Sequence, residues 1–243
     1  MKTTLSILFI IGTVVSLSVL FYYVRFDFEA DKIFLSISTF LFSIFTSFFI
    51  SRQASRFNRV RERVTEFGGK MSSIYRSSGH ISKELQNSIG KVVLKHYKKV
   101  LSSGEWDIHF KDKSTTLKDI HGLLDTYVVD AEVTKLSNQA LGSIVKNLAA
   151  CQDIRKQVVT LSKERIPKEQ WILILFFAAM LVSTVSTIES GSLVFASILK
   201  SAFVVSVISV LYILYKLNNL VYSESIMGQK SCEDVLEIIK GTK

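Results

Sequence analysis

Residues 33–50 read IFLSISTFLFSIFTSFFI, and residues 51–64 that follow read SRQASRFNRVRERV. The first segment has 18 residues and no charge, and a helix rising 1.5 Å per residue needs roughly 20 to cross a hydrocarbon core of ~30 Å. The second segment keeps apolar residues at helical spacing, at Phe57, Val60 and Val64, but is rich in arginine. Together they predict a membrane-spanning helix that continues unbroken out of the bilayer.

Three other stretches, residues 5–24, 171–188 and 193–215, are also long and apolar enough to span a membrane. The chain is 48% hydrophobic and 21% charged with a mean hydropathy of +0.32, so apolar and charged residues are segregated along it. The first stretch exceeds the usual signal-peptide core and lacks a cleavage site, which favours a retained span. The predicted fold class is an all-α integral membrane protein with four transmembrane helices in two hairpins that bracket a cytosolic helical bundle.

This fold implies four segments. Residues 1–50 form the first hairpin, with spans 5–24 and 33–50, and residues 51–170 form the cytosolic helical domain. Residues 171–215 form the second hairpin, with spans 171–188 and 193–215, and residues 216–243 form a cytosolic tail with a short helix.

Lysine and arginine set the expected orientation. Of the 30 basic residues, Arg25, Lys32 and Lys200 lie in the short loops or inside a span, which leaves 27 on the other side. By the positive-inside rule that side is cytoplasmic. We therefore expect a protein of the cell membrane with both termini and residues 51–170 in the cytosol.

Local patterns predict where the cytosolic helices begin and end. Gly68-Gly69 suggests a loosening of the first helix, and residues 77–79 suggest a turn. Further helices are expected over residues 81–101, from an N-cap at Ser114 or Thr115 to residue 128, and over residues 131–165. Ser231 with Asp234 resembles a capping box that opens the tail helix. Residues 106–110 are aromatic and give no clear indication of type.

Catalytic and cofactor chemistry has no positive support. The four histidines, His80, His96, His109 and His121, do not pair on one helical face with a carboxylate, and Cys151 and Cys232 are far apart in sequence. No phosphate-binding loop or nucleophile motif is present. We expect no enzyme activity, no cofactor, no metal and no nucleic-acid partner; the expected partners are the lipid bilayer, further copies of this chain and inorganic anions.

The second span has two unlike faces. At 100° per residue one sector is rich in hydroxyls and the other is rich in phenylalanine. The hydroxyl-rich sector, bordered by Ile44, supplies the pore-lining candidates Ser36, Thr39, Phe40, Ser43, Ile44 and Ser47. Small and hydroxyl residues also mediate packing between membrane helices, so a close helix contact is the alternative to a pore.

The charged residues near the spans also have two interpretations each. Five arginines, Arg52, Arg56, Arg59, Arg61 and Arg63, either contact anionic headgroups or line a cytosolic vestibule that concentrates anions. Lys200 is the only charge well inside a span. It either extends along its stem to the interface or attracts an anion, and Glu189 is a possible partner.

Three elements of the sequence carry a family likeness. They are the arginine-rich residues 56–63, the stretch His96-Tyr97-Lys98-Lys99 running to Glu105-Trp106, and residues 155–171, which end in Arg165-Ile166-Pro167 and Trp171. Together they resemble the bestrophin-like family of four-span membrane proteins. Lys216-Leu217-Asn218-Asn219 stands where the family has a Pro-Phe-Gly element. The resemblance implies two span pairs around a helical cytosolic domain and, by analogy with bestrophins, a pentameric anion channel. Phe40, Ile44 and Phe48 are then the implied neck positions.

Two functions are compatible with these patterns. The first is a homo-oligomeric ion channel, anion-permeable, with the second span lining the pore. The alternative is a membrane-anchored interaction or signalling module whose cytosolic domain recruits a soluble protein partner.

Overall fold

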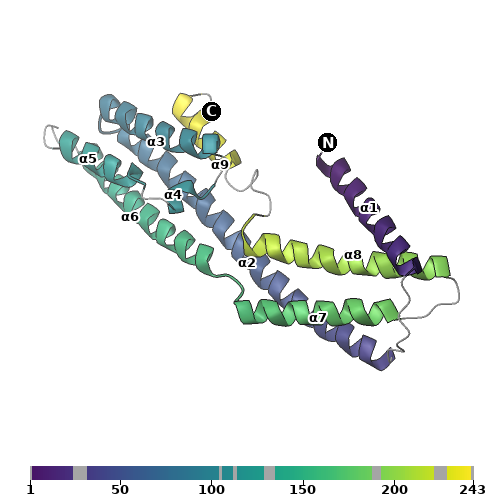
Figure 1. Cartoon of the computed structure of the whole chain (residues 1–243). Coiled ribbons are helices and arrows are strands. Elements are labelled where there is room, and N and C mark those ends of the chain that lie inside the picture. Colours follow the sequence, from purple (N-terminus) through teal and green to yellow (C-terminus); the bar gives the residue numbers. More distant parts are fainter. Residues whose placement is uncertain are drawn as a thin grey trace. The chain divides into compact units, whose positions relative to one another are not determined.

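The computed structural model describes residues 2–23, 32–103, 106–111, 114–128, 135–187, 193–221 and 229–241, and these residues contain helices and no strand. The helices, labelled in Figure 1, are α1 (Lys2–Tyr23), α2 (Lys32–Ser78), α3 (Lys83–Ser103), α4 (Ile108–Lys111), α5 (Thr116–Val128), α6 (Lys135–Lys163), α7 (Lys168–Thr187), α8 (Leu193–Asn218) and α9 (Gln229–Lys240). The all-helical fold class predicted from sequence is confirmed.

The helices fall into two compact units. Unit 1 comprises Met1–Ala54 and Arg165–Asn219, and unit 2 comprises Ser55–Glu164 and Leu220–Lys243. The segment boundaries expected from sequence, at residues 50, 170 and 215, stay predictions.

Unit 1 contains the apolar helices. Among the described residues, Ile33–Ser78, Lys168–Thr187 and Val194–Asn218 each include a stretch long and apolar enough to cross a membrane. In α1 the part whose side chains are described, Gly12–Tyr23, is apolar but shorter than a span. The first of the four predicted spans therefore stays a prediction, while the other three are candidate spans.

Helix α2 belongs to both units and runs without a break for 47 residues. This confirms the prediction of one helix that continues beyond the apolar stretch. The loosening expected at Gly68-Gly69 is wrong: the helix continues to Ser78, and the turn follows at residues 77–80. Phe67 and Met71 are buried on either side of the glycines, and this packing outweighs the ~1 kcal/mol by which each glycine disfavours a helix.

The core of unit 1 lies among α2, α7 and α8. Its buried apolar side chains are Phe42, Phe49, Ile166, Ile174, Ala178, Leu181, Val207 and Leu214. The rings of Phe45 and Phe177 stack with centroids 5.4 Å apart. Helix α1 contacts α8, where Ser18 Oγ donates a hydrogen bond of 2.9 Å to Ser201 Oγ.

Unit 2 has one core, to which helices α2, α3, α4, α5, α6 and α9 all contribute. The fully buried side chains at its centre are Val60, Met71 and Ile74 of α2, Leu85, Ile89 and Val93 of α3, Ile120 of α5, and Ile144, Leu148, Cys151 and Val158 of α6. Helix α9 adds Cys232, Val235 and Leu236. Gly90 of α3 allows α9 and the Tyr75 ring to pack closely against α3, because a Cβ at this position would lie 3.1 Å from Tyr75 Cε2 and 3.6 Å from Ile239 Cγ2.

Two predicted helix starts have different outcomes. Helix α5 begins at Thr116, directly after the expected caps, and the Ser114 hydroxyl accepts a hydrogen bond of 3.4 Å from the Thr116 amide. Helix α9 begins at Gln229, so Ser231 lies inside its first turn and cannot be its N-cap. An N-cap residue has a non-helical backbone, whereas Ser231 is already helical, so the capping box predicted at Ser231 is wrong.

Candidate functional site

The apolar part of α2 packs in unit 1 through one face only. Ser38, Phe42, Thr46 and Phe49 are buried, and the Thr46 hydroxyl donates to the Phe42 carbonyl over 2.6 Å. On the opposite face large apolar side chains are exposed, with Phe40 at 64% and Ile44 at 49%. The apolar part of α2 therefore has one face that packs against the rest of unit 1 and one face that unit 1 leaves uncovered.

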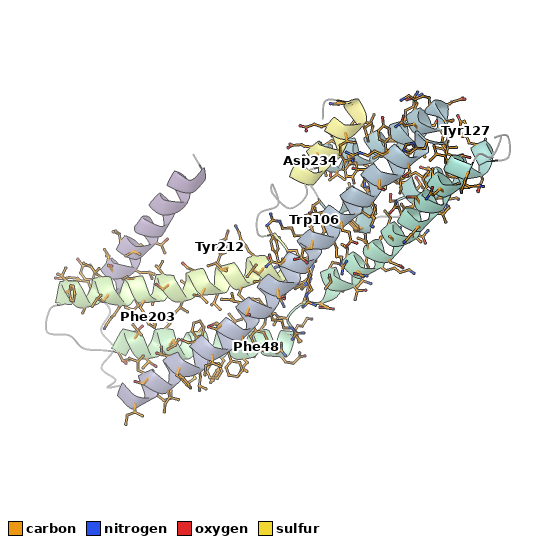
Figure 2. All side chains as sticks on the ribbon, turned by 180° about the vertical axis from the view of Figure 1, so that it is seen from behind. Phe48, Trp106, Tyr127, Phe203, Tyr212 and Asp234 are labelled. Atoms are coloured by element: carbon orange, nitrogen blue, oxygen red, sulfur yellow. The ribbon has the colours of Figure 1, made fainter. Side chains whose placement is uncertain are left out.

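Five of the six pore-lining candidates lie on the uncovered face. Ser36, Phe40, Ser43, Ile44 and Ser47 are exposed, whereas Thr39 is half-buried and donates to the Leu35 carbonyl of its own helix over 2.8 Å. Phe48, labelled on α2 in Figure 2, is exposed as well.

This placement shows that the hydroxyl-rich face of α2 is not used for helix packing within unit 1. Within unit 1, α2 makes its buried contacts through Ser38, Phe42, Thr46 and Phe49, a mixture of hydroxyls and rings, and not through the hydroxyl-rich face. The uncovered face is therefore available to another copy of the chain, to lipid or to a water-filled path.

The five arginines of α2 are not equivalent. Arg52, Arg59 and Arg61 are exposed, and Arg63 pairs with Glu66 at 2.6 Å. Arg56 is 2% exposed, so the expectation that it contacts headgroups or lines a vestibule is wrong.

Arg56 instead binds the end of helix α6. Its Nε donates to the Leu161 carbonyl over 2.6 Å and one terminal nitrogen donates to the Ser162 carbonyl over 2.8 Å. The last four carbonyls of a helix have no partner inside that helix, and a cation there also interacts favourably with the helix dipole. Arg56 thus stabilises the C-terminus of α6.

Lys200 belongs to α8, and its side chain contacts the end of α7. Its ammonium donates a hydrogen bond of 2.8 Å to the carbonyl of Ser186, in the last turn of that helix. This contact is the geometry expected of a lysine that extends along its stem to a polar partner. Glu189, the partner considered from the sequence, lies outside the described residues.

One family model, described as the Bestrophin-like domain, matches residues 7–220 and so covers most of the chain. The chain belongs to the Bestrophin-like family. No curated protein and no solved structure matches it. Family membership and the apolar helices together identify a membrane protein.

The Bestrophin-like match ends at Leu220, before α9. Near this end Asn218 is buried in unit 1, and its Oδ1 accepts a hydrogen bond of 2.8 Å from the Ile166 amide. Asn218 belongs to the Lys216–Asn219 stretch that departs from the expected family element. In this Bestrophin-like chain the stretch joins the end of α8 to the residues before α7.

Sequence reasoning missed two groups in this Bestrophin-like chain. Gln53 and Arg56 extend the buried face of α2 between Phe49 and Val60, at spacings of three and four residues that were visible in the sequence. A row of lysines on α3 lines a cleft in unit 2, and it too was visible as a spacing of four residues.

Proposed function

We propose that this Bestrophin-like chain forms a homo-oligomeric, anion-permeable ion channel in which the uncovered face of α2 surrounds the pore. The observation that carries the proposal is the exposure of Ser36, Phe40, Ser43, Ile44 and Ser47 on the side of α2 opposite its packed face. A subunit with so few spans cannot enclose a water-filled path, so the pore requires several copies with α2 nearest the axis. Five copies is the number suggested by analogy with bestrophins.

The uncovered face has the composition of a gated, non-selective constriction. Rings and branched side chains such as Phe40 and Ile44 close a narrow path by expelling water, while serine hydroxyls replace part of an ion's hydration on either side. Exposed arginines that follow on α2, Arg52, Arg59 and Arg61, add positive charge to the helix. Positive charge at the mouth of a path raises the local anion concentration.

The test compares two matched double substitutions in liposomes. We expect Phe40→Ala with Ile44→Ala to raise basal anion leak while the oligomer mass stays unchanged, because shrinking a hydrophobic constriction hydrates it. Ile172→Ala with Phe176→Ala is the control, since these are exposed residues of the same types, four residues apart, on α7. Leak should not change in the control.

Other outcomes have defined meanings. An intact oligomer with unchanged leak in the α2 variant would contradict the channel and favour the interaction module, in which the spans only anchor and oligomerise. Loss of the oligomer in the α2 variant alone would show that this face is a subunit contact, as in the packing alternative.

The proposal includes a cell-membrane location with both termini and unit 2 in the cytosol. Cys151 cannot report this, because it is fully buried and burial raises the pKa of its thiol to about 12. We therefore expect a Glu29→Cys variant to react with an impermeant thiol reagent on intact cells and an exposed Ser102→Cys variant to react only after lysis. The reverse pattern would invert the topology.

A further inference from the structure

A cleft of about 780 Å³ opens in unit 2 between helices α3 and α5. One wall is α3, with Lys91, Lys95 and Lys99. The other wall is the start of α5, with Ser114, Thr115 and Thr116. Small-molecule sites commonly have this size and combine an apolar surface with a few convergent polar groups.

The three lysines form a row along one side of α3. They are four residues apart, so they project from the same side of the helix over about 12 Å. All three are exposed, and no carboxylate of the described residues lies within 4.0 Å of their ammonium groups. Like charges at this spacing destabilise a helix, so the row has an unfavourable energy that a bound anion would offset.

The opposite wall supplies hydroxyls and little negative charge. Asp119 is the only carboxylate among the described residues that line the cleft, and it accepts a hydrogen bond of 2.9 Å from the Thr115 hydroxyl. Val92 and Leu123 add a small apolar surface between the walls. The lining therefore has a net positive charge on one side and hydrogen-bonding groups on the other.

His96 of α3 joins the two walls, and His109 of α4 stacks on its ring. The His96 and His109 rings lie 3.7 Å apart at 14°, and the His109 Nε2 donates to the His96 carbonyl over 3.0 Å. His96 Nδ1 lies 2.9 Å from the Thr116 hydroxyl, which joins α3 to the first residue of α5. Both walls are thus fixed before any ligand arrives, and preorganisation of this kind favours binding.

We propose that this cleft binds a small anion that carries two or more phosphate groups. Three ammonium groups over about 12 Å extend beyond the reach of one monovalent anion and match several phosphates along a chain. Ammonium groups bind phosphate as point charges, and the row offers one such group at each turn of α3. The proposal does not rest on ion conduction, so it can fail or hold independently of the channel.

The experiment measures binding of inorganic tripolyphosphate to the full chain in nanodiscs, by calorimetry at fixed ionic strength. We expect Lys95→Gln to weaken binding about tenfold, because it removes a charge-assisted contact at the middle of the row. The matched control is Lys98→Gln, an exposed lysine of the same helix that does not line the cleft. It removes the same net charge and should leave the affinity within about twofold.

A second probe distinguishes a free ligand from a lipid headgroup. Binding of tripolyphosphate that depends on Lys95 but not on Lys98 supports a soluble phosphate ligand. Binding of a water-soluble phosphatidylinositol bisphosphate alone, with the same dependence on Lys95, supports a headgroup. Equal losses in Lys95→Gln and Lys98→Gln, or no binding of either probe, would overturn the proposal.

Discussion

The two halves of helix α2 share one buried face, but their exposed faces differ in chemistry: the first is apolar and the second is charged. In unit 1 the exposed residues include Phe40 and Phe48, and in unit 2 they include Arg59, Arg61 and Glu62. The buried face continues through both, from Phe42 to Ile74, at spacings of three and four residues once the half-buried Val64 is included. The buried residues of a helix therefore say little about its surroundings, whereas the residues that the rest of the chain leaves exposed indicate whether that part of the helix is in an apolar or an aqueous environment.

The strongest test of this comparison uses two phenylalanines of one helix. We expect Phe42→Ala, at a buried site, to lower the unfolding free energy by ~3 kcal/mol, because the cavity left among α2, α7 and α8 collapses only in part. Phe40→Ala, at an exposed site, should change it by less than ~1 kcal/mol. Denaturant titration in one detergent measures both, and equal effects would show that the two faces are not distinct.

The second test concerns the polar interruption of the buried face. Arg56→Leu should lower the unfolding free energy by roughly 3 kcal/mol, because the Leu161 and Ser162 carbonyls lose a charged donor. Arg56→Lys should recover only part of the loss, since an ammonium cannot supply the same planar pair of donors. Arg59→Leu, at an exposed site, is the control and should stay within ~0.5 kcal/mol.

The third test uses pH and affects unit 2. Burial, followed by the charge of His109, lowers the pKa of His96 from 6.5 to about 3. Between these pH values the unfolded chain binds a proton at His96 and the folded chain does not. The contribution of His96 to the free energy of unfolding is therefore full above pH 6.5 and falls as the pH decreases. The expected slope from this residue is roughly 1 kcal/mol per pH unit.

His96→Gln isolates that slope. The variant should lose stability less steeply than the wild type between pH 6.5 and 4, while His80→Gln, at an exposed site, should keep the wild-type slope. Parallel curves for wild type and His96→Gln would mean that His96 is not neutral in the folded chain.

The smallest expected effect is at Lys200. Lys200→Met removes the hydrogen bond to the Ser186 carbonyl and should lower the thermal stability by the equivalent of ~1 kcal/mol. Because the ammonium has a structural partner, anion flux in liposomes should be unchanged. A fall in flux that Lys200→Arg restores would assign the charge to the ion path instead.

Periodicity predicted α2 well because its two signals, an uncharged stretch and apolar residues at helical spacing, are both local. The same signals placed Phe40 and Ile44 opposite Phe42 and Phe49. The start of α5 was equally local, since a capping hydroxyl at Thr115 lies next to the helix it begins.

The sequence did not separate Arg56 from its four arginine neighbours. The neighbouring residues in sequence are similar for all five arginines. Only the tertiary contact between Arg56 and the C-terminus of α6 makes this arginine buried. The lysine row was missed for a similar reason. A solvated charged face and one wall of a cleft have the same spacing until the start of α5 supplies the second wall.

The position of helix α9 in the chain determines when the core of unit 2 can be completed during synthesis. It packs against α3 in unit 2, and Tyr75 Oη of α2 donates to its Ile239 carbonyl over 3.3 Å. The ribosome nevertheless makes α9 after both α7 and α8. Until α9 is made, the apolar side chains of unit 2 that pack against Cys232, Val235 and Leu236 lack this cover. Such exposed surface is what chaperones recognise. Synthesis of α9 is then the step that completes this core.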